Sequence, residues 1–198
     1  MNPKILSIDG WMDEIELQWL YDTVQKIPKG GIFIEIGAWK GRSSGALYEG
    51  AGSNKAVISI DTWKGQPDLV DGAHKEAVTS DLFAVYLENM RALGFDPKPY
   101  HRGALGPQYI ISDSIQAAAL FDDNSVHVVF IDGDHLITGQ DIDAYLPKVR
   151  SDGLLTGHDY FCFYEEIQQE IHKRFYIHQL IHSIWVRHVG LQKPGWYT

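Results

Sequence analysis

The sequence predicts an α/β fold in which a mainly parallel sheet carries helices on both faces. Short β-branched runs alternate along the chain with segments of helical periodicity. The last two β-rich runs, 177–181 and 184–189, are separated only by His182-Ser183, which indicates an antiparallel C-terminal hairpin strand. The 198 residues, 44% hydrophobic and 22% charged, suit one globular domain spanning residues 1–198.

The first elements follow from periodicity and chain breakers. Apolar residues recur at helical spacing from Ile15 to Ile27, so residues 1–28 are expected to form an N-terminal helical appendage that ends at Pro28-Lys29-Gly30-Gly31. Residues 32–36 are apolar except for Glu35, which is typical of a strand buried on both faces. A glycine-containing turn follows this strand and leads into a helix.

The same alternation continues to the end of the chain. The expected helices cover 43–49, 82–93, 115–121, 142–149 and 164–175, and the expected internal strands cover 56–60, 126–131 and 154–156. Because ligands of open α/β sheets bind outside the carboxyl ends of the strands, polar residues that follow these strands are the candidate site.

Composition excludes several classes of protein. A net charge of -9 without a basic cluster disfavours general nucleic-acid binding. The single cysteine, Cys162, rules out a disulfide framework or a Cys-based zinc site within one chain. No apolar run approaches the roughly 20 residues that span a bilayer, and the first residues do not resemble a signal peptide. We therefore expect a cytoplasmic protein that does not bind membranes.

Two strand ends carry residues suited to a nucleoside ligand. Gly37 and Gly41 allow a tight turn and close approach to a ligand, and Ser43 lies at the start of the next helix. Glu35, two residues before the first glycine, would repel a pyrophosphate but suits an ammonium group. Asp61 ends the next strand, where a carboxylate accepts ribose hydroxyls. A plain strand-to-helix turn and a turn or N-cap aspartate remain alternatives. A nicotinamide site is disfavoured because the third glycine of its motif is absent.

A third polar stretch, Ser112-Asp113-Ser114, precedes the helix expected at residue 115. One of these residues is expected to cap that helix, because serine and aspartate satisfy its unpaired N–H groups. An adenine contact would be an additional role.

The fourth strand end combines acids with imidazoles. Asp132, Asp134 and His135 follow one strand, and His158 and Asp159 follow the next. Like charges crowded at adjacent strand ends need a cation or substrate to balance them. Carboxylates favour Mg²⁺, Ca²⁺ or Mn²⁺, whereas the imidazoles favour a softer metal or act as a base.

Five stretches together resemble a known family. They are FIEIGAWKGRSS, VISIDTWKG, SDSIQAAALFDD, VVFIDGDH and LLTGHDY, and they span residues 33–160. The chain resembles the class I S-adenosylmethionine-dependent methyltransferases, in particular the methyltransferase-24 and macrocin O-methyltransferase-like branch. The resemblance implies a Rossmann-like, seven-stranded, mainly parallel sheet with an antiparallel last strand. It also implies that residues 62–81 form a loop covering the substrate.

The resemblance also assigns roles to residues of the cofactor site. It implies that Glu35 and Gly37 contact the methionine portion of S-adenosylmethionine, and that Asp61 holds the ribose. Other residues of the implied cofactor site are Gly41, Ser43, Thr62, Trp63, Asp113, Ser114 and Asp132, of which Thr62, Trp63, Asp113 and Ser114 would border the adenine.

For the reaction, the resemblance implies methylation of a hydroxyl on a small molecule such as a sugar, assisted by Mg²⁺ or another divalent cation. Asp132, Asp134 and Asp159 are the expected metal ligands, and His135 is the expected general base with Asp134 as its competitor. His158 and Tyr160 are expected to border the substrate. The alternatives are a catalytically silent binding protein and another reaction on the same scaffold. A homodimer paired through the C-terminal strands is left open.

Overall fold

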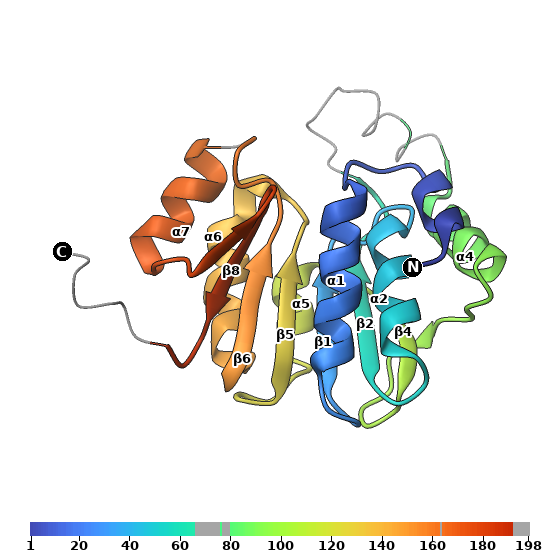
Figure 1. The fold of residues 1–198 in the computed structure, drawn as a ribbon, viewed down its shortest axis with the longest axis horizontal. Helices are drawn as coiled ribbons and strands as arrows, with labels where there is room; N and C mark the ends of the chain where they lie inside the picture. Colours follow the sequence, from blue (N-terminus) through green and yellow to red (C-terminus); the bar gives the residue numbers. More distant parts are fainter. Residues whose placement is uncertain (66–75, 77–79, 163, 192–198) are drawn as a thin grey trace.

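The computed structural model describes residues 1–65, 76, 80–162 and 164–191, and its centre is one eight-stranded sheet (Figure 1). The strands lie side by side in the order β3-β4-β2-β1-β5-β6-β8-β7. Their bounds are β1 Ile32–Ile36, β2 Ala56–Asp61, β3 Lys98–Pro99, β4 Gly106–Ile111, β5 Val126–Ile131, β6 Val149–Gly157, β7 Gln179–Ile181 and β8 Ile184–His188.

The predicted parallel sheet and antiparallel hairpin are both confirmed. All pairs from β3 to β6 are parallel, whereas β8 runs antiparallel to both β6 and β7. The sheet has eight strands rather than the seven that the resemblance implies, because β3 adds a two-residue edge. We did not predict β3 or β4. The latter begins with Gly106 and Pro107, two residues that are depleted in strands, and this hides its extended character.

Helices cover both faces of the sheet, as predicted. Helices α1 (Glu14–Lys26), α2 (Arg42–Ala51) and α4 (Leu82–Ala92) pack on one face, and α5 (Ser114–Ala118), α6 (Thr138–Tyr145) and α7 (Gln169–Arg174) pack on the other. Figure 1 shows α1 and α2 in front of β1 and β2. Alternate residues of β1 divide between the two cores, with Phe33 in the first and Ile34 in the second.

The described chain also contains short 3₁₀ and π-helical turns. One of them explains why the boundary of a predicted helix was wrong. They are 3₁₀ turns at Pro3–Ser7, His135–Ile137 and Leu146–Lys148, and a π-helical turn at Tyr164–Gln168. The helix predicted at 142–149 instead spans Thr138–Tyr145. Ile142, Tyr145 and Val149 do share one buried core at helical spacing, but Pro147 lies in the intervening 3₁₀ turn and Val149 begins β6.

Most of the loop expected at 62–81 lies outside the described residues, which include only 62–65, 76, 80 and 81 of that range. Within the described part of the chain, no helix combines the length and apolar character needed to cross a membrane.

Candidate active site

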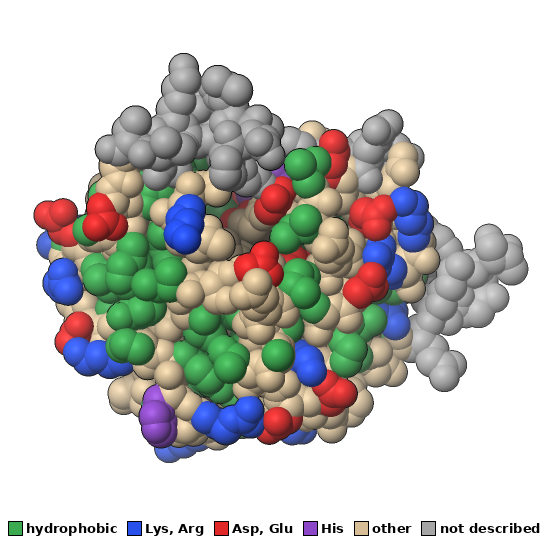
Figure 2. Space-filling model, turned by 180° about the vertical axis from the view of Figure 1, so that it is seen from behind, with side chains coloured by type: hydrophobic (Ala, Val, Ile, Leu, Met, Phe, Trp, Pro, Cys, Tyr) green, Lys and Arg blue, Asp and Glu red, His purple; other side chains and the backbone are tan. Residues whose placement is uncertain are grey.

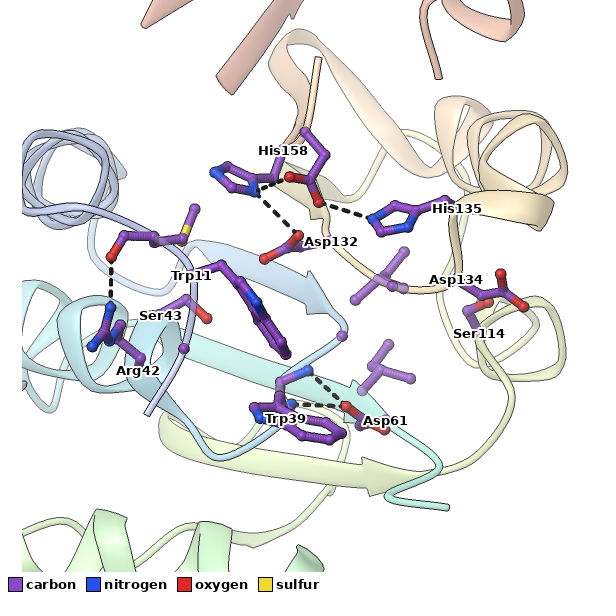
Figure 3. A pocket seen from close by; sticks show the side chains of 18 of the residues that line it. Trp11, Trp39, Arg42, Ser43, Asp61, Ser114, Asp132, Asp134, His135 and His158 are labelled. Carbon is purple, nitrogen blue, oxygen red and sulfur yellow. Dashed lines mark hydrogen bonds and ion pairs between the residues drawn. The ribbon is translucent and has the colours of Figure 1, made fainter. Parts of the chain in front are cut away.

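The carboxyl ends of β1, β2, β5 and β6 border a cavity of about 1090 Å³ (Figure 3). Eleven residues predicted from the sequence line it. They are Gly37, Ser43, Asp61, Thr62, Asp113, Ser114, Asp132, Asp134, His135, His158 and Asp159. Glu35, Gly41, Trp63 and Tyr160 do not line it. The predicted strand ends are therefore neighbours, as expected for parallel strands.

The loop between β1 and α2 requires glycine at two positions. Gly37 has a φ of +85°, and a Cβ there would lie 2.1 Å from the backbone oxygen of Asp132. Gly41 has a φ of +91° at the N-terminus of α2, and its Cβ would lie 2.5 Å from Cε of Met90. The first glycine lets the loop pass directly against the end of β5, and the second lets α2 start close to α4.

Asp61 fastens this loop to the end of β2. Its Oδ2 accepts hydrogen bonds from the backbone N–H groups of Ala38 and Trp39, both at 2.9 Å, and its Oδ1 accepts one from Trp63 at 2.7 Å. The carboxylate also lines the cavity, so lone pairs beyond these three bonds can serve a ligand. The structural role of Asp61 as a turn aspartate, which the sequence left open beside the ligand role, is therefore confirmed.

Glu35 lies beneath the loop rather than in the cavity. Its side chain is fully buried, and Oε2 accepts hydrogen bonds from Ser44 and Ser59 at 2.5 and 2.6 Å. Its Oε1 has no hydrogen-bond partner among the described residues. Burial raises the pKa of Glu35, although the nearby serine hydroxyls oppose this shift.

Trp63 and Tyr160 belong to the cores rather than to the cavity wall. Trp63 is buried, and its Nε1 donates to the backbone oxygen of Trp39 at 2.8 Å. Tyr160 is also buried, and its hydroxyl lies 3.0 Å from Nε2 of His172. Both residues follow a strand end in sequence, but their large rings turn into apolar packing. Neither is placed to line the cavity as the sequence-based roles assumed.

Asp113 caps α5, which confirms the predicted capping role. Its Oδ1 accepts from the backbone N–H groups of Ile115 and Gln116 at 2.9 and 3.2 Å. Ser114 donates to Oδ1 of the buried Asp141 at 2.5 Å. Burial raises the pKa of Asp141 to about 7. Both Asp113 and Ser114 line the cavity, and their contact with an adenine remains a prediction.

The ends of β5 and β6 bring together a group of acids around one buried imidazole. His158 Nδ1 lies 3.2 Å from Asp159 Oδ1 and 3.6 Å from Asp132 Oδ1, and its Nε2 lies 3.1 Å from Glu16 Oε1. These carboxylates raise the pKa of His158 to about 11 despite its burial, which acts in the opposite direction. A protonated His158 therefore balances much of the negative charge.

Asp132 and Asp159 differ in environment although they lie side by side. Burial raises the pKa of Asp132 to about 7. The pKa of Asp159 is lowered, because bonds to His135 and His158 outweigh its burial. Its Oδ2 lies 2.8 Å from Nε2 of His135 (Figure 3). Asp159 also has a φ of +57°, an uncommon value for a residue with a Cβ, and such backbone strain is frequent at functional sites.

One predicted metal ligand lies apart from this group. Among the described residues, Asp132, His158 and Asp159 offer ligand atoms that all lie within 4.8 Å of one another, and Asp134 is not in the set. The carboxylate of Asp134 caps the 3₁₀ turn that follows it, accepting from the backbone N–H of Leu136 at 2.9 Å. Figure 3 shows Asp134 beside Ser114 and away from Asp132.

The N-terminal segment forms part of the cavity wall, and among its lining residues only Trp11 was considered from the sequence for a place at the substrate entrance. Asp9, Trp11, Asp13 and Glu16 line it, and Arg42 lines it from the start of α2. Asp13-x-x-Glu16 has the spacing of a capping box, and the structure contains that box. This local signal indicates where α1 starts, but it carries no information about the contact between Glu16 and His158.

The glycine-containing loop after β1, the acid at the end of β2 and the acid-imidazole group all border one open cavity. The sequence assigns the chain to a family over most of its length. Residues 34–160 match the family described as a methyltransferase domain, and the chain belongs to that family. No match distinguishes the macrocin-like branch, and no curated protein matches the chain.

Solved structures confirm the fold. A Thermotoga maritima S-adenosylmethionine-dependent O-methyltransferase is 13% identical with a TM-score of 0.59, covering 86% of this chain and 54% of its own. A Bacillus cereus O-methyltransferase in complex with S-adenosylhomocysteine is 15% identical with a TM-score of 0.55, covering 86% and 71%. An S-adenosylhomocysteine-bound Podospora anserina methyltransferase is 13% identical with a TM-score of 0.57, covering 79% and 62%. The chain thus spans less than two thirds of the Thermotoga and Podospora proteins.

Proposed function

We propose that this chain transfers a methyl group from S-adenosylmethionine to a hydroxyl group of a small molecule. In this proposal Asp132, His158 and Asp159 hold a divalent cation and His135 is the general base. The observation that carries it is the position of the acid-imidazole group, which lies in the same cavity as the glycine loop and Asp61. The named O-methyltransferases of the same fold support the reaction type.

The cavity suits the cofactor in size and chemistry. A volume of about 1090 Å³ accommodates a nucleoside-sized molecule together with a small acceptor. Gly37 brings loop backbone to the end of β5, where the reacting groups would meet, and Asp61 offers oxygen acceptors for the ribose hydroxyls. The unpartnered Oε1 of Glu35 beneath the loop suits an ammonium group above it, directly or through water.

The acid-imidazole group suits a divalent cation. Three ligand atoms from Asp132, His158 and Asp159 converge, and Asp134 is engaged in capping, so we replace it by His158 in the proposed ligand set. Binding of the cation would displace the proton that His158 holds in the metal-free protein. Two carboxylates with one imidazole suit a first-row metal such as Mn²⁺ better than Mg²⁺. When bound, such an ion would orient an acceptor hydroxyl and lower its pKa.

His135 is placed to remove the hydroxyl proton. Its Nε2 contacts Asp159 Oδ2, so a neutral His135 that donates this proton to the carboxylate presents Nδ1 as its basic nitrogen. The ring lines the cavity and is partly exposed. S-Adenosylmethionine supplies an activated methyl group, and the chain's own task is to align the acceptor oxygen and take its proton. General-base assistance of this kind contributes roughly 10² to 10⁴ in rate.

The test combines cofactor binding with turnover. Calorimetric titration with S-adenosylhomocysteine, with and without Mn²⁺, should show binding that becomes tighter with the metal, and NAD should not bind. In a screen of hydroxylated acceptors, His135→Ala should lower turnover roughly 10² to 10⁴-fold with unchanged affinity for S-adenosylhomocysteine. The control, His182→Ala, changes a histidine that contacts Asp13 at the cavity and should retain activity. Equal losses of turnover and cofactor affinity in His135→Ala would remove His135 from the base role.

A further inference from the structure

The segment before α1 forms one wall of the cavity and is held there by residues of the β1–α2 loop and of the start of α2. We call residues 6–13 the N-terminal arm. The guanidinium of Arg42 donates to the backbone oxygens of Leu6, Ile8 and Met12 at 3.0, 2.6 and 2.9 Å. Lys40 is paired with Asp9 of the arm at 2.8 Å. Lys40 within the β1–α2 loop and Arg42 at the start of α2 therefore position the arm.

Trp11 is the large apolar residue of the arm that stays mostly outside the core. Its neighbours Ile8 and Met12 are buried in the core, whereas 70% of Trp11 is exposed although it lines the cavity. Figure 3 shows its indole pointing into the pocket between Asp132 and Trp39. The two indole rings are tilted by 50° with centroids 5.7 Å apart. Because most of this ring is exposed despite its contact with Trp39, it offers apolar area to a flat ligand in the cavity.

The cavity wall is strongly acidic. Eight of its described lining side chains are carboxylic acids, and Arg42 is the single lysine or arginine among them. Arg42 is bound to arm carbonyls, His158 and His182 contact carboxylates, and His135 contacts Asp159. Figure 2 shows acidic side chains beside the hollow on that face of the molecule. Even with the proposed divalent cation bound, the acids of this wall outnumber its cations, so the wall repels anions at short range.

From these observations we infer the class of acceptor: an uncharged or cationic hydroxylated ring compound whose apolar ring face packs on Trp11. This inference rests on the proposed function, because it assumes that the remainder of the cavity holds the cofactor. It excludes acceptors that carry a carboxylate or a phosphate close to the reacting hydroxyl. The ring is either aromatic or a sugar, since both present an apolar face to an indole.

The test uses two sets of ring compounds, each with a neutral, a cationic and an anionic member, titrated into protein saturated with S-adenosylhomocysteine and Mn²⁺. The aromatic set is catechol, dopamine and protocatechuate, and the sugar set is methyl glucoside, glucosamine and glucuronate. In the set that binds, the neutral and cationic members should bind at least about 10-fold more tightly than the anionic one, and high salt should reduce the difference. Equal binding of the anionic member, or no binding by either set, would overturn the inference.

Variants test the part played by Trp11. Trp11→Ala should weaken the binding probe about 10-fold, and Trp11→Phe should restore most of the affinity. Ile15→Ala is the matched control, because Ile15 is 54% exposed but does not line the cavity. Affinity for S-adenosylhomocysteine should be the same in all three variants. A loss confined to S-adenosylhomocysteine in Trp11→Ala would place Trp11 in the cofactor half and overturn the inference. Failure of the wild-type protein to bind S-adenosylhomocysteine would instead overturn the proposed function.

Discussion

Replacing Glu16 by glutamine tests whether the N-terminal helix stabilises the acid-imidazole group. Glu16 Oε1 lies 3.1 Å from His158 Nε2 and accepts the backbone N–H of Ser183 at 2.9 Å, and Oε2 accepts that of Asp13 at 3.1 Å. The side chains of Glu16 and His158 are 5% and 6% exposed, so solvent screens their attraction weakly. Glutamine preserves the shape of the side chain and removes its charge.

The expected loss is about 3 kcal/mol in the free energy of unfolding. Removing one partner of a buried ion pair costs roughly 3–5 kcal/mol, and we expect the lower end because Asp132 and Asp159 still contact the imidazole. Urea unfolding at pH 7, followed by circular dichroism, should show the midpoint falling by about 1.5 M for a slope of about 2 kcal/mol per M.

The matched control is Asp13→Asn, in the same capping box. The ion pair of Asp13 with His182 is about half exposed, and asparagine caps helices as well as aspartate does, so the change should cost at most about 1 kcal/mol. A double-mutant cycle of Glu16→Gln with His158→Asn should give a coupling of at least about 1 kcal/mol. Equal destabilisation by Glu16→Gln and Asp13→Asn, or additive losses in the cycle, would refute the reasoning.

Two further changes test other parts of the site. Gly37→Ala should abolish binding of S-adenosylhomocysteine in calorimetry, because a Cβ 2.1 Å from the Asp132 backbone oxygen must displace the loop or the end of β5; unchanged affinity would contradict this. Asp141→Asn tests a pH effect. Burial raises the pKa of Asp141 from 3.8 to about 7, so ionisation of this carboxyl group opposes folding. Between pH 4 and 8, the free energy of unfolding of the wild-type protein should therefore fall by about 4 kcal/mol relative to the variant, as measured by urea unfolding at both pH values. Parallel pH profiles of the two proteins would disprove that assignment.

Much of the fold was predictable because its signals are local. The β-branched runs of β1, β2 and β5, the helical spacing of α1 and the two-residue gap in the hairpin each lie within one short segment. The tight turn at Gly37 was predictable for the same reason. The end of β6 was predicted, but its start at Val149 was not, since an apolar residue after a helix suits either element.

The candidate site was predicted to the level of strand ends and no further. Parallel strands bring their carboxyl ends to one edge, so Asp61, Asp132 and Asp159 had to lie along the same edge of the sheet once its topology was correct. The direction in which each side chain points could not be predicted from the sequence. Asp134 turns to cap a local helix turn and Tyr160 packs into the core, and both orientations depend on what surrounds them in three dimensions.

The sequence by itself determined the α/β alternation, the glycine loop, the order of the polar strand ends and the family they indicate. Only the tertiary structure decided that Glu16 contacts His158 and Ser183, the latter 167 residues away in sequence, and that Trp11 faces the cavity. The physical reason is the separation along the chain over which each kind of interaction acts. Propensity, capping and turn chemistry act over a few residues, whereas the charge balance of a buried imidazole and the shape of a cavity are set by side chains that meet only after the chain has packed.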